Sequence, residues 1–134
     1  MTMKINCVVL NYNDAETVEK LVRGIENYGC LDRIVVVDNA STDDSWQRLK
    51  RLEGGKTDLI RAGSNQGYGA GNNLGVRFAM EKNKATHVVI ANPDVFFTES
   101  CILKLARIFS GHPHVGVAAA AMEDRNYGSS LNGW

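Results

Sequence analysis

Short apolar runs rich in β-branched residues alternate along this chain with longer segments in which apolar residues recur at helical spacing. Each short run has the length of a strand, and each longer segment predicts an amphipathic helix. The runs that predict strands are residues 5–10, 31–37, 58–61, 86–92 and 115–119. Strands that alternate with helices form right-handed βαβ units. We therefore expect an α/β fold, with a doubly wound, mostly parallel sheet and helices on both faces.

Capping residues indicate where the helices begin. Asn13 or Asp14 is a candidate N-cap for the first helix, which has Gly29 near its end, and Ser41 or Thr42 is a candidate for the second. The four helices carry these inward-facing residues: Val18, Leu21, Val22 and Ile25; Trp46, Leu49 and Leu52; Leu74, Phe78 and Ala79; Ile102, Leu105, Ala106 and Phe109. Residues 1–120 are expected to form one domain, and residues 121–134, which show no periodicity, an irregular tail.

The fourth predicted strand is an almost continuous apolar run, which is typical of strands buried on both faces of a parallel sheet. Pro93 ends the run because it has no N–H to donate, and Asp94 follows just beyond the carboxyl end of the strand. Ligands of open α/β sheets bind at this end, and Mg²⁺ is typically held by one or two carboxylates together with substrate phosphates. Asp94 is therefore either a metal ligand or an ordinary turn residue that caps the next helix.

Polar residues follow each of the first four predicted strands. The strand order 3-2-1-4 would place Tyr12 and Asp94 in one crevice, with Asp38 beside them. Tyr12 can stack on a base, and Asp38 can accept hydrogen bonds from a base N–H or a ribose hydroxyl. A surface aromatic and a turn residue explain the same two positions equally well. The glycine-rich run 63–75 either presents backbone N–H groups to phosphate or sugar oxygens or is a flexible loop.

Charge balance and motif spacing exclude several classes of protein. Fifteen basic and fifteen acidic side chains balance, so we expect no nucleic-acid partner and no anionic membrane surface. Asn72 occupies the third glycine position of G-x-G-x-x-G, and no G-K-[ST] triplet exists, which excludes the dinucleotide and P-loop fingerprints. His112 and His114 have no carboxylate or cysteine at metal-ligand spacing, and we interpret them as part of a surface turn.

The cysteines and the apolar runs bear on the cellular location. Cys7, Cys30 and Cys101 are an odd number at wide spacing, which fits neither a disulfide framework nor a zinc site, and we expect reduced core thiols. No signal-peptide pattern follows Met1, and no apolar run reaches the length of a transmembrane segment. A cytoplasmic protein with a small-molecule partner is the resulting expectation.

Four segments, taken in order, resemble the motifs of family 2 glycosyltransferases with the GT-A fold. They are VVLNYN at 8–13, VVVDNASTDDS at 35–45, NQGYGAGNNLG at 65–75 and ANPD at 91–94. The resemblance covers residues 4–120. The combination of Asn-Pro-Asp with a G-x-G-x-x-N-N loop is similar to rhamnosyltransferases and related enzymes of bacterial cell-surface polysaccharides.

The resemblance implies a site for a nucleotide-diphosphosugar donor. Tyr12 would lie along the base, Asp38 would hydrogen-bond to it, and Asp94 would bind Mg²⁺ or Mn²⁺ bridging the two phosphates. The other donor-binding residues implied are Asn39, Asn65, Gly67, Gly71, Asn72, Asn73 and Asn92. The implied reaction is inverting transfer of the sugar to a hydroxyl of a saccharide or lipid-linked acceptor, in the cytoplasm or at the inner face of the membrane.

Three features depart from the family pattern. Asn92 replaces the first carboxylate of D-x-D, and Asn72 stands where many relatives carry arginine. These enzymes take their general base from a second half of the protein. In this sequence Glu123 and Asp124 are candidates for the base by residue type alone. We therefore expect a truncated, donor-binding half, whose uncovered apolar surface favours a homo-oligomer. A non-catalytic nucleotide-sugar-binding module is the alternative. A nucleotidyltransferase would need a glycine-rich signature after the first strand, which is absent.

Overall fold

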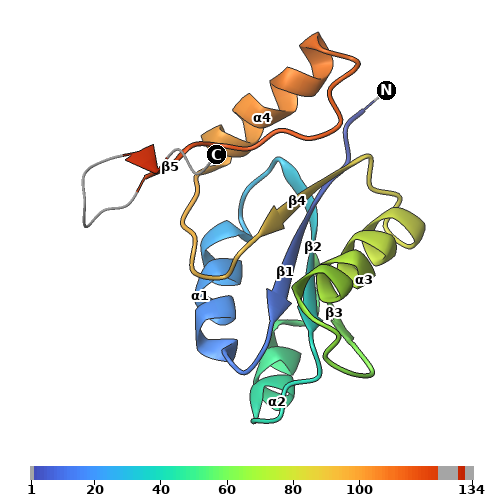
Figure 1. The fold of residues 1–134 in the computed structure, drawn as a ribbon, viewed down its shortest axis with the longest axis vertical. Coiled ribbons are helices and arrows are strands. Elements are labelled where there is room, and N and C mark those ends of the chain that lie inside the picture. Colours follow the sequence, from blue (N-terminus) through green and yellow to red (C-terminus); the bar gives the residue numbers. More distant parts are fainter. Residues whose placement is uncertain (1, 124–129, 132–134) are drawn as a thin grey trace. The chain divides into compact units, whose positions relative to one another are not determined.

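The computed structural model describes residues 2–123 and 130–131. The chain forms two compact units, Met1–Phe96 and Phe97–Trp134. The elements of the first unit, in chain order, are β1 (Ile5–Asn11), α1 (Ala15–Ile25), β2 (Leu31–Asp38), α2 (Ser45–Leu49), the 3₁₀-helix η1 (Lys50–Leu52), β3 (Thr57–Arg61), α3 (Tyr68–Glu81) and β4 (His87–Ala91) (Figure 1). The second unit contains α4 (Glu99–Gly111), β5 (Met122–Glu123) and β6 (Ser130–Leu131).

The first unit is built on a four-stranded sheet in the order β3-β2-β1-β4, and all of its strand pairs are parallel. This result confirms the predicted α/β fold and the predicted strand order. In register, Asn11 of β1 lies opposite Asp38 of β2, and Asp38 lies opposite Arg61 of β3. Three strands therefore end in one row of polar residues at the carboxyl edge of the sheet.

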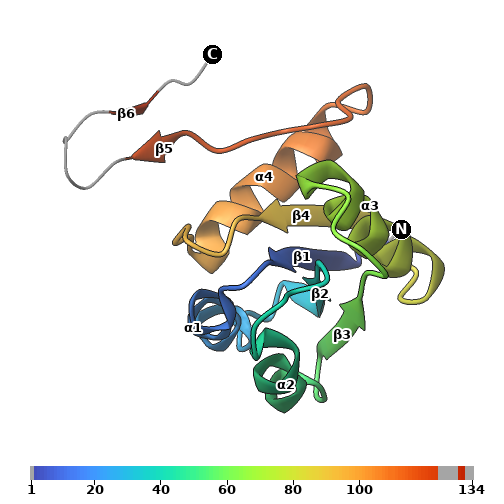
Figure 2. The ribbon, with the colours of Figure 1, turned by 60° about the horizontal axis from the view of Figure 1, so that its bottom comes forward.

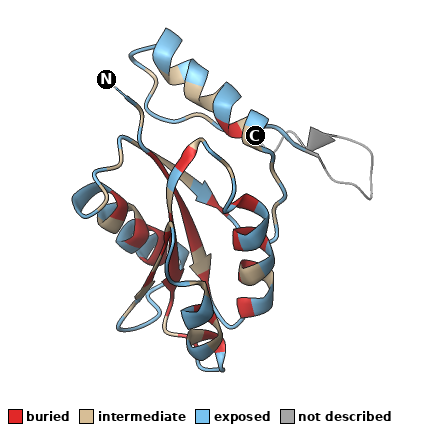
Figure 3. Ribbon diagram, turned by 180° about the vertical axis from the view of Figure 1, so that it is seen from behind, coloured by how far each residue is buried: buried red, intermediate tan, exposed pale blue. Residues whose placement is uncertain are grey.

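Helices cover both faces of this sheet (Figure 2). Alternate residues of a strand point to opposite faces. Val8, Val35 and Val37 form a buried cluster with Ala79 of α3 on one face. The intervening strand residues point to the face that α1 and α2 cover, where Val18 and other residues of α1 are buried. Buried positions are concentrated in β1 and β2, the two strands with neighbours on both sides (Figure 3).

Helix α3 lies close to the sheet because two glycines face it. A Cβ atom at Gly75 would be 2.4 Å from Val8 Cγ1, and one at Gly71 would be 2.6 Å from Leu10 Cδ1. A residue with a Cβ at either position would require the neighbouring atoms to shift. The two glycines therefore determine how closely α3 approaches β1 and β2.

Strand β4 is less buried than its sequence predicts. Burial on both faces was expected, but within the described residues β4 pairs with β1 alone, and Ile90 is 51% exposed. The expectation of a fully buried strand is therefore wrong. The physical reason is that β4 lies at the edge of this four-stranded sheet, while α3 packs mainly over β1 and β2.

Three helix boundaries differ from the prediction. Helix α1 follows Asp14, as one of the two candidates predicted, but ends at Ile25, before Gly29. Helix α2 begins at Ser45, so neither Ser41 nor Thr42 caps it. The side chains of those two residues instead accept hydrogen bonds from Asn13, in the loop after β1. Helix α3 begins at Tyr68, inside the glycine-rich run that was expected to precede it.

In the second unit, α4 begins at Glu99, after Thr98, whose hydroxyl accepts a hydrogen bond from the backbone N–H of Cys101 at 3.2 Å. The fifth predicted strand is wrong, because residues 115–119 are not in a strand and Val117 is 88% exposed. The expected irregular tail contains a two-residue pairing of β5 with β6. Residues 124–129 and 132–134 of this tail lie outside the described part.

Candidate functional site

The loops that follow β1 and β2 are joined by hydrogen bonds at the carboxyl edge of the sheet. Asn11 Nδ2 donates to Asp38 Oδ1 at 3.0 Å and to Ser41 Oγ at 3.2 Å. The Ser41 hydroxyl and backbone N–H donate to the two oxygens of Asp38, at 2.6 and 3.2 Å. We call these three side chains the strand-end junction. All three are buried, so they form a rigid base for the loops above them.

The junction continues through a second asparagine of the first loop. Asn13 Oδ1 accepts the backbone N–H of Thr42 at 2.8 Å, and the Asn13 N–H donates to Ser41 Oγ at 2.9 Å. Asn13 and Ala40 have φ values of +53° and +58°. Residues other than glycine adopt this conformation rarely and at a cost, so hydrogen bonding in the surrounding loops must maintain it.

A short turn leads from the junction into α2. The backbone N–H of Ser45 donates to Asp43 Oδ1 at 2.8 Å. Hydrogen bonding from Ser45 holds the pKa of the Asp43 carboxyl below its ordinary value. A charged carboxylate at this position also suits the positive end of a helix.

Asp38 is held by partners from within the chain. Its side chain is fully buried, and Arg61 Nε lies 3.4 Å from Oδ2. Asn11 and Ser41 donate three hydrogen bonds to the carboxylate, and the guanidinium of Arg61 adds an ion pair. The structure therefore places Asp38 at the predicted edge but engages it with donors from within the chain.

Asn39, the next residue, has an acceptor atom to spare. Its Nδ2 donates to Asn65 Oδ1 at 3.1 Å and to the carbonyl oxygen of Gly67 at 3.3 Å. Both partners are acceptors, which fixes the orientation of the amide. Asn39 Oδ1 receives no hydrogen bond from the described residues, although the side chain is only 3% exposed. Leaving a buried acceptor unpaired costs free energy, so this atom requires an explanation.

The start of α3 forms the opposite wall of the site. Gly67 precedes the helix with a φ of +98°, a conformation that favours glycine. Asn72 Nδ2 donates to the carbonyl oxygen of Tyr68 at 3.1 Å, and Asn72 Oδ1 is a second buried acceptor without a donor in the described residues. The Tyr68 hydroxyl donates to Asn92 Oδ1 at 2.8 Å and thereby joins α3 to the end of β4.

Asp94 lies in a hollow of about 270 Å³ between the loop after β4 and one face of α1. The residues that line it are Thr17, Lys20, Leu21, Gly24, Ile25, Tyr28, Pro93, Asp94, Val95 and Phe96. Within residues 2–123 and 130–131, no three His, Cys, Asp or Glu side chains gather as a metal site would require. Asp94 therefore fits only a cation that takes most of its ligands from substrate phosphates and water.

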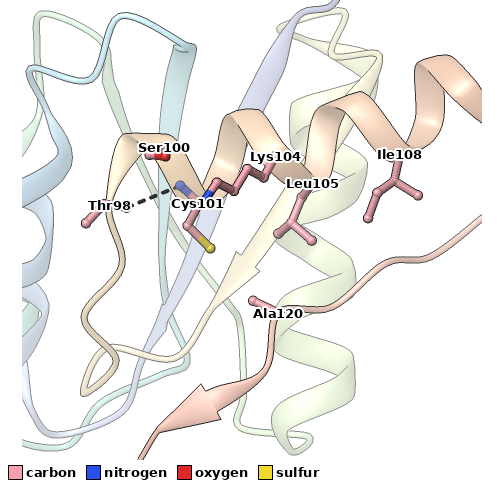
Figure 4. A pocket seen from close by; sticks show the side chains of 7 residues that line it. All are labelled: Thr98, Ser100, Cys101, Lys104, Leu105, Ile108 and Ala120. Atoms are coloured by element: carbon pink, nitrogen blue, oxygen red, sulfur yellow. Dashed lines mark hydrogen bonds between the residues drawn. The ribbon is translucent and has the colours of Figure 1, made fainter.

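A second hollow, of about 320 Å³, lies within the second unit along α4 (Figure 4). Thr98, Ser100, Cys101, Lys104, Leu105, Ile108 and Ala120 line it. Its lining contains neither a carboxylate nor a histidine. It therefore lacks the residue types that most often act as a general base.

The structure brings five of the ten predicted site residues together. Asp38, Asn39, Asn65 and Gly67 are linked by the contacts above, and Gly71 packs against Leu10 and Asn39. Tyr12 and Asn73 are exposed and close to this network in sequence. The side chain of Glu123 and all of Asp124, the two candidate bases, lie outside the described residues.

Three participants were missed from the sequence: Asn11, Arg61 and Tyr68. Asn11 and Arg61 are the last residues of their strands, and a polar residue at the end of an apolar run was the available signal. The role of Tyr68 depends on a contact with Asn92, which is 24 residues away in the sequence. No local pattern indicates such a contact.

The family model and the curated relatives that match this chain are all glycosyltransferases. The model of the family described as "Glycosyl transferase family 2" matches residues 7–130. The chain is 28% identical over 104 residues to the low-salt glycan biosynthesis hexosyltransferase Agl10 of Haloferax volcanii, covering 78% of this chain and 32% of that protein. It is 26% identical over 127 residues to the dTDP-rhamnosyl transferase RfbF of Shigella flexneri, covering 94% and 41%. The chain thus spans a third to two fifths of these curated relatives.

Among solved structures, the fold is similar to the mannosyltransferase PcManGT of Pyrobaculum calidifontis in complex with GDP-Man and Mn²⁺. The TM-score is 0.73 at 22% identity, covering 91% of this chain and 36% of that one. This likeness confirms the fold. No helix in the part of the chain that the structure describes is both long and apolar enough to cross a membrane.

Proposed function

Because the chain belongs to glycosyl transferase family 2, we propose that it binds a nucleotide-diphosphosugar donor and supplies the donor side of a sugar transfer to an acceptor hydroxyl. The first unit and the following residues to 120 would form the donor-binding domain. The acceptor would be a saccharide or a lipid-linked saccharide, in cell-surface polysaccharide synthesis at the cytoplasmic side of the membrane. Relatives that synthesise glycans or transfer rhamnose support this choice.

The observation that carries the proposal is a pair of buried amide oxygens without donors at the carboxyl edge of the sheet. Asn39 Oδ1 and Asn72 Oδ1 are both held in place by the bonds of their own Nδ2 groups. In open α/β folds this edge is where ligands bind. A base N–H or a ribose hydroxyl would supply the missing donors, and pairing them removes the cost of leaving buried acceptors unsatisfied.

Different side chains would then have different tasks in the donor site. Asp38 would hydrogen-bond to the base, and its bonds with Asn11 and Ser41 also hold the loop that carries Asn39. Tyr12, 48% exposed after β1, is available to stack on the base. The loop bearing Asn65 and Gly67 would line the donor from the side of α3.

Asp94 is the residue that would hold Mg²⁺ or Mn²⁺. A divalent ion there would stabilise the negative charge that develops on the departing nucleoside diphosphate. Asn92 stands two residues earlier, and its amide oxygen already accepts a hydrogen bond from the Tyr68 hydroxyl. Asn92 would therefore support the loop rather than act as a second metal ligand. An inverting transfer requires the acceptor hydroxyl to attack the anomeric carbon from the side opposite the leaving group. That attack needs a general base.

A second candidate function is a nucleotide-sugar-binding module without turnover. Donor hydrolysis separates the two candidates. An enzyme releases nucleoside diphosphate from its nucleotide sugar, whereas the module binds the nucleotide and releases none.

The test is a calorimetric titration of UDP, GDP and dTDP with and without Mn²⁺. We expect one of the three to bind, and to bind more tightly with Mn²⁺. In Asp94→Asn the enhancement by Mn²⁺ should disappear while metal-free binding remains, because the variant keeps the shape and loses the charge. Unchanged metal dependence in Asp94→Asn would remove Asp94 from the metal site, and no binding of any nucleotide would contradict the function itself.

A further inference from the structure

The guanidinium of Arg61 reaches across the carboxyl edge of the sheet to the loop that follows β2. Arg61 Nε lies 3.4 Å from Asp38 Oδ2, and an Nη2–H donates to the carbonyl oxygen of Ser41 at 3.4 Å. One side chain of β3 therefore contacts both the first and the last residue of the turn 38–41. Asn39 lies within that turn.

An aromatic ring holds the guanidinium in place. Trp46 of α2 has its ring centroid 5.2 Å from Arg61 Cζ, within the range of a cation–π interaction. Lys50 of η1 also lies over this ring, with its ammonium nitrogen 5.5 Å from the centroid. Lys50 is therefore a matched comparison. It shares the ring of Trp46 with Arg61, but the contacts to the Asp38 carboxylate and the Ser41 carbonyl described above come from Arg61.

Asp38 is a buried charge, and Arg61 is the cation paired with it. The carboxylate is fully buried, while the Arg61 side chain is 45% exposed. Without Arg61 the buried charge would keep only the neutral donors of Asn11 and Ser41. Removing one partner of a buried charge is costly, so the surrounding loop would be expected to rearrange.

The turn 38–41 is also strained at Ala40, which has a φ of +58°. A strained conformation persists only where its surroundings over-determine it. Arg61 contacts the residues at both ends of this turn, Asp38 and Ser41. Asn39 lies between these two residues, so its orientation depends on the conformation of the turn.

We propose that Arg61 is a positioning residue for nucleotide binding. By holding Asp38 and the Ser41 carbonyl, it keeps the turn 38–41 in the conformation that presents Asn39 Oδ1 as an acceptor. Arg61 acts through Asp38 and touches no substrate atom. The inference rests on the proposed function, since it concerns the affinity of the same nucleotide site.

The test is a double-mutant cycle on the full chain, read as the dissociation constant for whichever of UDP, GDP and dTDP binds the wild type. Arg61→Gln should weaken binding about tenfold, and Arg61→Lys should restore part of it because it keeps the charge. Lys50→Gln should change the affinity by less than about twofold, since surface substitutions away from a network have small effects. Asp38→Asn combined with Arg61→Gln should bind no more weakly than Asp38→Asn alone.

A second readout separates positioning from loss of stability. In the free protein, the side-chain amide NMR signal of Asn39 should shift in Arg61→Gln and stay in place in Lys50→Gln. If Arg61→Gln does not fold, the comparison of Asp38→Asn with the double variant still applies, because neither leaves an uncompensated charge at Asp38.

Two results would overturn the proposal while leaving the proposed function intact. The first is wild-type affinity in Arg61→Gln. The second is a double variant that binds about tenfold more weakly than Asp38→Asn, which would show that Arg61 acts independently of Asp38. A wild-type chain that binds none of the three nucleotides overturns the proposed function, and this inference with it.

Discussion

The side-chain amide of Asn11, at the end of β1, donates a hydrogen bond to the carboxylate of Asp38, at the end of β2, over 3.0 Å. The two residues lie opposite each other in the sheet, and both are fully buried. A buried carboxylate requires hydrogen-bond donors, and an amide at the neighbouring strand end supplies one without a further charge. This pair joins the ends of two adjacent strands, from which the loops of the candidate site depart.

Loss of this amide should destabilise the fold. In Asn11→Ala the Asp38 carboxylate loses one of its donors, and the free energy of unfolding should fall by about 1–3 kcal/mol. Urea denaturation followed by circular dichroism measures the change. Gln47→Ala, at an exposed position of α2, is the control and should stay within about 0.5 kcal/mol of the wild type. Equal stability of the two variants would mean that the Asn11 bond contributes little.

Two glycines of α3 should respond to alanine in opposite directions. At Gly75 a Cβ would meet Val8 and Val37, at 2.4 and 2.9 Å, so Gly75→Ala should lower the free energy of unfolding by about 1–3 kcal/mol through overpacking. At Gly69 nothing lies within 4 Å, and Gly69→Ala should raise it by up to about 1 kcal/mol through helix propensity. The same urea measurement compares them, and the close approach of α3 would be disproved by a Gly75→Ala variant as stable as Gly69→Ala.

The buried thiol of β1 should make the fold sensitive to alkali. Burial, with a smaller contribution from Cys30, raises the pKa of Cys7 from 9.0 to about 12. Above the lower value the unfolded thiol loses its proton while the folded thiol keeps it. The stabilisation is therefore complete below pH 9 and is lost as the pH rises toward 12. Relative to Cys7→Ala, the wild type should lose about 1.4 kcal/mol per pH unit in this window. Parallel curves for the two proteins would contradict the assignment.

The parallel sheet and the edge of the candidate site were predictable from the sequence, and the strand order is the one most often seen in such folds. The β-branched runs and the helical periodicity between them determine a parallel sheet, and the polar residues Tyr12, Asp38 and Asp94 mark the strand ends. These features depend on residues that are neighbours in the chain. They therefore remain visible in the sequence without coordinates.

Features that depend on a distant partner were not predictable. Residues 115–119 have the composition of a strand, but composition does not supply a neighbouring strand with which to pair. The same limit applies to β4, whose apolar run reads as a central strand although the structure places it at an edge.

Neighbouring site residues were also indistinguishable in the sequence. Asp38 and Asn39 are adjacent, and either can accept a hydrogen bond from a nucleotide. Their difference arises from Asn11, Ser41 and Arg61, which engage Asp38, and from Asn65, which fixes the amide of Asn39. Long-range packing thus decides which acceptor remains unpaired.

The most direct test of the account is to follow the side-chain amide signals of Asn39 and Asn72 by ¹⁵N NMR during titration with a nucleoside diphosphate and Mg²⁺. The two buried oxygens should gain donors, so both amide signals should shift in proportion to occupancy, while the signals around Cys101 and Lys104 on α4 remain unchanged. Shifts confined to α4, with Asn39 and Asn72 unaffected at saturating nucleotide, would contradict a donor site at the carboxyl edge of the sheet.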